Sequence, residues 1–306
     1  MRAFCSVVLA AASLALAGPV LAQAPDPMVR TEGLKQVSPH VHVIPDNSVP
    51  MVPNVGFVVG ERGVLVVDTG MGPRNGAAVA QVAQKLGGSR ALYLVTTHFH
   101  PEHDLGASAF PASTALIRSA DQIKDIEEFG LQLAKVFASR SQFIADLLKD
   151  ADFRKADVTF EKDYMLDLGG GVRAQIIAMG PNHTRGDTAV WVESDRVLFS
   201  GDVVMQRQPA FASPYSRIGQ WLTSLDRLDA FKPSLVVPSH GPTGDAAFIA
   251  NYRAYLIEVR DRTTTEKKAG KTAEQATEAV SAAMAHRYPD KGRLTAAIRA
   301  AGAEAP

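Results

Sequence analysis

The sequence has a single cysteine, Cys5, so disulfide bonds cannot hold this fold together. It has no excess charge of either sign, because 32 Lys and Arg residues balance 32 Asp and Glu residues. That balance argues against a strongly basic protein that binds nucleic acid. Beyond the N-terminus no apolar run is long enough to cross a membrane. The 306 residues are 46% hydrophobic and 21% charged, which is typical of a globular protein with one large α/β domain or two smaller ones.

The N-terminus has the three-part pattern of a secretory signal peptide. Arg2 gives a positive start, residues 6–16 are almost all apolar, and Val20-Leu21-Ala22 offers small residues at a cleavage site. A membrane anchor is the alternative, but the run is shorter than the ~20 residues of a span, and Gly18-Pro19 interrupts it. We therefore predict a signal peptide over residues 1–22, export to the periplasm or the exterior, and a mature chain without cysteine.

Strand-like and helical segments alternate along the rest of the chain. This alternation, with hairpins mixed in, predicts an α/β fold with mixed sheets. We expect one domain over residues 23–245 and a helical extension over residues 246–306 that packs on the same domain. The predicted strands are 41–44, 55–59, 64–67, 91–95, 175–178, 188–192, 196–199 and 235–238, and the predicted helical segments are 76–86, 121–150, 222–228, 252–268, 272–285 and 293–300.

A cluster of metal-ligand side chains follows the apolar strand 91–95. His98, His100 and His103 lie within six positions and enclose Glu102, although the whole chain has only 8 histidines. Neutral imidazole is the commonest zinc ligand, and open zinc sites also take carboxylates. A polar loop that happens to be rich in histidine is the alternative, but the density of ligand types favours a metal site.

Three further side chains of the same kinds stand where later strands open into glycine-containing loops: His183, Asp202 and His240. Ligands and catalytic groups in α/β proteins concentrate at such strand ends. Taken singly, each has a plain structural explanation, because Asp202 could cap a helix and either histidine could be a hydrogen-bonded loop residue.

The order of these motifs, beginning with Asp68-Thr69-Gly70, resembles that of the metallo-β-lactamase superfamily. The resemblance covers residues 40–244, about two-thirds of the chain. It implies a four-layer αβ/βα sandwich with the active site at one edge. It also implies two zinc ions per chain, the first held by His98, His100 and His183, the second held by Glu102, His103 and His240, with Asp202 bridging the two and Asp68 orienting the histidine loop.

Glu102 departs from the family pattern, which usually has aspartate at this position. The longer side chain either reaches the second metal from a shifted backbone or swings out and weakens that site. The stretch from Thr97 to Gly106 resembles a subgroup of exported zinc hydrolases found beside quinoprotein dehydrogenase systems, in which glutamate is common here. The absence of cysteine from the mature chain excludes family branches that use a thiolate ligand.

The resemblance implies that a hydroxide held by the two zinc ions cleaves an ester-, thioester- or amide-like bond of a small-molecule substrate, with Glu102 and Asp202 as catalytic groups. A class B-type β-lactamase and a non-catalytic metal-binding partner of a periplasmic redox system are the alternatives. Iron or manganese also suits such ligands. We expect no nucleic-acid partner and no membrane contact after signal cleavage, and the sequence does not predict the oligomeric state.

Other candidates are weaker. His40 and His42 could bind metal from one strand, although polar side chains are ordinary on edge strands. Residues 46–53 form either a flap over the site or an ordinary hairpin loop. Phe211, Tyr215 and Trp221 follow Asp202 closely and could line an apolar substrate pocket, although core packing suits Trp221 equally well. Phe129, Phe137 and Phe143 have helical spacing, which favours core or an internal lid.

Overall fold

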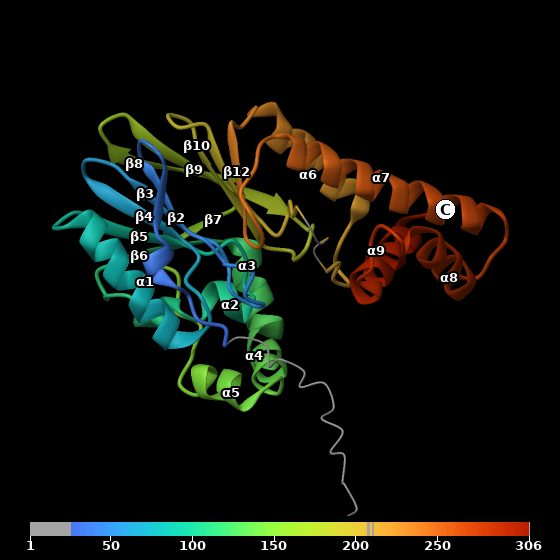
Figure 1. The fold of residues 1–306 in the computed structure, drawn as a ribbon, viewed down its shortest axis with the longest axis horizontal. Helices are drawn as coiled ribbons and strands as arrows, with labels where there is room; N and C mark the ends of the chain where they lie inside the picture. The colour runs from blue at the N-terminus through green and yellow to red at the C-terminus, as the bar shows by residue number, and fades with distance from the viewer. Residues whose placement is uncertain (1–25, 207–208, 210, 306) are drawn as a thin grey trace, which may run out of the picture.

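The computed structural model describes residues 26–206, 209 and 211–305 (Figure 1). The predicted signal peptide and Cys5 lie outside these residues. Among the helices that are described, none combines the length and the apolar character needed to span a membrane.

The first half of the chain builds a sheet of seven strands that lie in sequence order. Strands β1 to β4 pair antiparallel, and β4 to β7 pair parallel. Parallel pairing brings the carboxyl ends of β4 and β5 to the same edge. The strands are β1 (Lys35–Ser38), β2 (Val41–Ile44), β3 (Val55–Val59), β4 (Gly63–Val67), β5 (Ala91–Val95), β6 (Ala115–Ser119) and β7 (Val158–Phe160).

The second half builds a sheet of five strands in the order β12-β11-β10-β9-β8. All its pairs are antiparallel except β11 with β12. The carboxyl ends of β11 and β12 therefore lie beside the loop that enters β10. The strands are β8 (Asp163–Gly169), β9 (Val172–Gly180), β10 (Asp187–Val192), β11 (Val197–Gly201) and β12 (Leu235–Pro238).

The two sheets pack face to face, with helices on their outer sides (Figure 1). The inner layer holds fully buried side chains such as Leu65 and Val190. Gly56 allows close approach of the sheets, because a Cβ atom there would lie 2.2 Å from the Phe199 ring. Helix α1 (Gly72–Gly87) covers the first sheet, and α6 (Ile218–Ala230) covers the second. The predicted four-layer sandwich is thus confirmed.

The segment predicted as helical over residues 121–150 is helical over residues 120–138, with one π-helical turn inside that stretch, and again over residues 142–148. Ser141 interrupts it, because its side chain accepts a hydrogen bond from the Ile144 amide and caps a new helix. The pieces are α3 (Ala120–Asp125), the π-helical turn η3 (Ile126–Gly130), α4 (Leu131–Ala138) and α5 (Gln142–Leu148). Shorter helical elements elsewhere are η1 (Thr31–Gly33), α2 (Pro101–Asp104) and η2 (Ala107–Ala109).

The C-terminal segment is helical, as the sequence predicts. It comprises α7 (Ala247–Lys268), α8 (Ala273–Met284) and α9 (Lys291–Glu304). Buried residues of all three helices share one apolar cluster with α6, and α8 and α9 pack at the far end of α7 (Figure 1). The Glu304 carboxylate also accepts hydrogen bonds from the Ile218 and Gly219 amides at the start of α6.

Candidate metal centre

The chain carries its metal-ligand side chains to one edge of the sandwich. Strands β4 and β5 end side by side, so Asp68 and the loop of His98 and His100 begin next to each other. Glu102 and His103 lie on α2, which follows directly. Each of these residues comes from the end of a parallel strand, where backbone hydrogen bonding stops and side chains converge.

The second sheet supplies the remaining side chains at the same edge. His183 lies in the loop between β9 and β10, Asp202 follows β11, and His240 follows β12. The Thr188 amide donates to the Thr97 carbonyl over 2.7 Å, which joins the two sheets beside the histidine loop.

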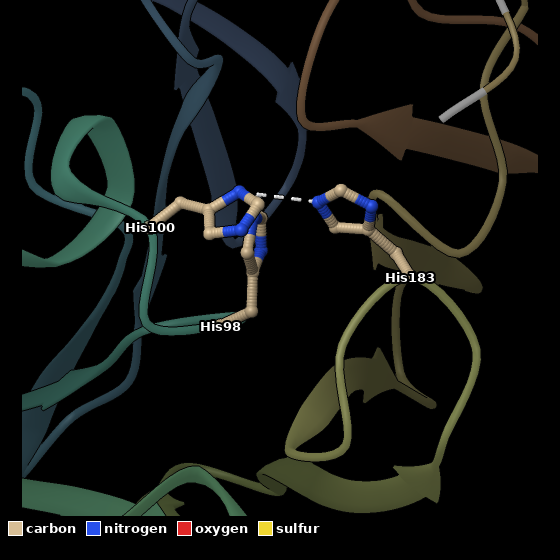
Figure 2. A group of neighbouring side chains, drawn as sticks. All are labelled: His98, His100 and His183. Carbon is tan, nitrogen blue, oxygen red and sulfur yellow. Dashed lines mark hydrogen bonds between the residues drawn. The ribbon is translucent and has the colours of Figure 1, made fainter. Parts of the chain in front are cut away.

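All seven side chains that the resemblance implies as ligands meet in three overlapping groups. Within each group the ligand atoms lie within 4.8 Å of one another. Figure 2 shows the all-histidine group, in which His183 faces His98 and His100 from another loop and its Nε2 lies 3.2 Å from His100 Nδ1. The groups are His98, His100 and His183; Glu102, His103 and His240; and His98, His103 and Asp202, so the third group connects the first two.

Asp68 holds the histidine loop in place through hydrogen bonds of its carboxylate. Its backbone has a φ of 64°, a left-handed conformation that aspartate adopts more readily than most residues. Its carboxylate accepts from the Thr97 amide at 2.7 Å, the Thr97 hydroxyl at 3.0 Å and His103 Nδ1 at 2.9 Å. Because the Thr97 hydroxyl donates to Asp68, His98 Nδ1 donates to it, over 3.2 Å. Each imidazole thus uses Nδ1 for this support and leaves Nε2 as its ligand atom.

Two backbone carbonyls fix the other imidazoles in the same way. His183 Nδ1 donates to the Phe211 carbonyl at 2.5 Å, and His240 Nδ1 donates to the Val52 carbonyl at 2.9 Å. A carbonyl oxygen only accepts, so the proton is on Nδ1 and the lone pair on Nε2. Such a hydrogen bond on the far nitrogen is the usual arrangement of a metal-ligating histidine.

Several buried polar atoms in these groups have no hydrogen-bond partner among the described residues: Nε2 of His98 and His103, Oε2 of Glu102 and Oδ1 of Asp202. Leaving buried polar atoms unpaired is costly, and such atoms call for an ion or water. These atoms are nitrogen and carboxylate oxygen, the donors that zinc takes in open sites. The residues present therefore fit a pair of metal ions.

The electrostatics of the site suit cation binding. Burial, together with the neighbouring histidines, lowers the pKa of His98 and His100 well below the usual range, so both are neutral. Burial alone would raise the pKa of Asp202, but the surrounding histidines lower it below its ordinary value. Burial raises the pKa of Glu102. Burial opposes a charge on His103, but Asp68 raises the pKa of His103 to about 9.

Two residues that the sequence analysis did not single out hold the outer loops. The Asp187 carboxylate accepts from the His183 amide and the Thr184 hydroxyl, both at 2.6 Å. The Asn54 amide group donates to the carbonyls of Pro238 and Gly241 at 2.7 and 2.8 Å, on either side of His240. In the sequence, both residues could have been noticed because each is a polar residue directly beside an apolar strand.

A buried ion pair supports the loop from behind. Arg118 on β6 is bonded to both carboxylate oxygens of Asp104, the residue after His103, with one contact at 2.9 Å. Both side chains are at most 1% exposed. Removing one partner of such a pair would leave an uncompensated buried charge.

A cavity of about 1160 Å³ opens over the metal-ligand side chains. Residues 46 and 48–51 line it, so the 46–53 segment borders the site. Phe211 and Tyr215 line it as well, whereas Trp221 is buried in the core and donates to the Val203 carbonyl. Of the aromatic residues predicted as core or an internal lid, Phe129 lines the cavity, and Phe137 is buried but reaches the cavity wall.

Of the two histidines at residues 40 and 42, His40 has a structural role instead. His40 Nδ1 lies 2.7 Å from the buried Asp195 carboxylate, which also accepts from the His40 amide. These contacts tie the β1–β2 turn to the β10–β11 turn. Within the described part of the chain, neither histidine belongs to a group of metal ligands.

Comparison with known proteins gives consistent results. A family model described as the metallo-beta-lactamase superfamily matches residues 49–240. A linear primary-alkylsulfatase of Pseudomonas sp. is 23% identical over 219 residues, which cover 60% of this chain and 40% of that protein. The human acyl-coenzyme A thioesterase MBLAC2 is 25% identical over 204 residues, which cover 61% of this chain and 72% of the thioesterase.

Solved structures share the fold at lower identity. A sec-alkylsulfatase from Pseudomonas sp. superposes with a TM-score of 0.71 at 14% identity, over 88% of this chain and 49% of the other. A metallo-beta-lactamase family protein from Thermus thermophilus superposes with a TM-score of 0.61 at 17% identity, over 87% of this chain and 93% of the other. The chain thus spans less than half the length of the two alkylsulfatases.

Proposed function

Because the chain belongs to the metallo-beta-lactamase superfamily, with a family model matching residues 49–240, we propose that it is a zinc-dependent hydrolase of small-molecule esters, thioesters or amides. The observation that carries this proposal is the set of unpaired, buried ligand atoms of His98, His103, Glu102 and Asp202 beneath an open cavity. A closed four-ligand cage would instead favour a structural zinc site.

In this proposal the residues divide between two metal ions. His98, His100 and His183 would hold the first, and Glu102, His103 and His240 would hold the second, while Asp202, which groups with His98 and His103, could serve both. Bound zinc supplies a water of lowered pKa and an electrophile for the scissile carbonyl.

The chain's own contribution is orientation. Asp68 binds the Nδ1 proton of His103, so Nε2 is the nitrogen of this ring that would serve as the ligand. The Glu102 carboxylate reaches within 4.0 Å of His103 Nε2 on the cavity side, where it can accept a proton from a bound water or deliver one to a leaving group.

The human thioesterase relative supports a thioester as the substrate class. We further propose export to the periplasm or the exterior, as the sequence of residues 1–22 suggests. The likeness to the exported zinc hydrolases found beside quinoprotein systems stays a prediction. The choice of zinc over iron or manganese stays a prediction too. So does the expectation that the protein has no nucleic-acid or membrane partner.

The test is hydrolysis of a substrate panel by protein loaded with zinc. We expect turnover of acyl-coenzyme A thioesters or p-nitrophenyl esters that a chelator abolishes and added zinc restores, because the ligand atoms have no other partner among the described residues. A cephalosporin in the same panel tests the β-lactamase alternative. Tight zinc binding without turnover of any substrate would instead favour the non-catalytic alternative and contradict the proposal.

A further inference from the structure

The cavity over the metal centre has apolar walls away from the metal ligands. Helix α4 contributes Leu133, Val136 and Phe137, and the 46–53 segment contributes Val49 and Met51. Val136 and Phe211 are 48% and 49% exposed, which is unusual for large apolar side chains, and both line this cavity. Apolar surface left open inside a cavity indicates that the ligand has an apolar portion to cover it.

Three arginines among the described residues line the cavity, and two of them are paired with carboxylates. Arg185 contacts both Asp125 and Glu128 at 2.6 Å. Arg293 contacts Asp290 at 3.2 Å. Their charges are neutralised by the protein and are not available to a ligand without breaking an ion pair.

Arg140, just after α4, is different. Its guanidinium lies 4.0 Å from the centre of the Phe137 ring, and Nη1 donates to the Met51 sulfur at 3.1 Å. Thioether sulfur is a weak acceptor. Among the described residues no carboxylate lies within salt-bridge distance of Arg140, so its other donors are free to bind an anion.

The carboxylates around the cavity do not compensate Arg140 either. Asp46 accepts from the Ser48 and Gly241 amides at 3.1 and 2.8 Å. Asp125 and Asp290 are paired with arginines, and the remaining two carboxylates belong to the metal centre: Glu102 and Asp202. Among the described residues of the cavity wall, Arg140 is therefore the arginine whose charge no carboxylate of the protein compensates.

We propose that the site takes substrates whose apolar portion carries an anionic group, and that Arg140 binds this group across the cavity mouth. This inference rests on the proposed hydrolase function and names its substrate class. Arg140 acts in specificity: the planar guanidinium, held between Phe137 and Met51, presents its free donors to a carboxylate, sulfate or phosphate on the substrate.

The experiment compares p-nitrophenyl monoesters of dicarboxylic acids with p-nitrophenyl esters of monocarboxylic acids of the same chain length, across a series of lengths. Wild-type protein is expected to prefer the carboxylate-ended ester at one or more lengths. Arg140→Gln should lower kcat/KM for those esters by about three- to tenfold, mainly through KM, because the pairing is partly exposed. The methyl-ended esters should be unaffected, and Arg140→Lys should keep part of the preference.

Arg74→Gln is the matched control. The Arg74 guanidinium also lies over a phenylalanine ring, at 5.8 Å from the Phe143 centre, but it does not line the cavity. It should behave as wild type. Equal loss of both ester classes in Arg140→Gln, or no loss of either, would overturn the role of Arg140.

Binding separates this inference from the proposed function. Octane-1-sulfonate has an apolar chain and an anionic group and cannot be hydrolysed. By calorimetry on zinc-loaded protein, it should bind Arg140→Gln about three- to tenfold more weakly than wild type or Arg74→Gln. If no ester is hydrolysed but this difference is found, the hydrolase proposal fails while Arg140 stays the anion-binding residue. Equal binding to all three proteins would overturn the inference.

Discussion

Exchanging Asp202 for asparagine is expected to lower kcat by about 10²–10⁴-fold, since loss of a metal removes several kcal/mol of transition-state stabilisation. Asp202 Oδ2 lies 3.6 Å from His183 Nε2, and Asp202 shares a group with His98 and His103, so it contacts both halves of the centre. A neutral amide is a far poorer zinc ligand than a carboxylate. Rate and metal content should therefore fall together when both are measured on one preparation.

Asp195→Asn is the matched control for this change. Its carboxylate is also buried, at 1% exposure, and accepts several hydrogen bonds, but it lies at the other end of β11 from the metal ligands. Asp195→Asn thus removes the charge of a buried aspartate without changing the metal centre. Full activity and wild-type metal content in Asp202→Asn would show that Asp202 is not a ligand.

Glu102→Gln is expected to lose the second metal and about 10²–10⁴-fold in rate, the usual loss when a group that transfers protons is removed. The structure favours a ligand role over a side chain that has swung away. Glu102 is 7% exposed, its Oε2 is buried without a partner among the described residues, and it groups with His103 and His240. Metal content and hydrolysis rate should be compared in the wild type, Glu102→Gln and Glu102→Asp.

Glu102→Asp separates the reach of the side chain from its charge. It restores the family's usual residue and should keep two metals, with a smaller loss of rate because the backbone of α2 is adapted to glutamate. Should Glu102→Gln instead retain both metals and full activity, Glu102 is neither a ligand nor an acid–base group.

Much of the site could be predicted from the sequence because each ligand follows a strand directly. The histidine loop comes after the apolar run of β5, and Asp202 and His240 come after β11 and β12. Since strand ends collect at one edge of a sheet, ligands distant in sequence could be expected to meet. The resemblance supplied their division into two ligand sets, and that division stays a prediction.

Other features were hidden by tertiary packing. Strand β8 was not predicted, because Met165 places an apolar side chain on the exposed face, between Asp163 and Asp167, and so breaks the alternation of polar and apolar residues. The break at Ser141 was also missed, because the apolar spacing continues on both sides of it. Arg140 carries no sequence signal at all. Its significance depends on which cavity carboxylates are already paired, and only the three-dimensional arrangement establishes that.

The most direct test of the central claim, that these side chains hold two metal ions, is the metal content of wild-type protein purified without added metal and then titrated with zinc. We expect saturation near two ions per chain. A chelator should remove them in two steps, with the ion held by Glu102, His103 and His240 leaving first, because the all-histidine group does not depend on the unusual glutamate. Saturation at one ion with no second event would contradict the binuclear centre.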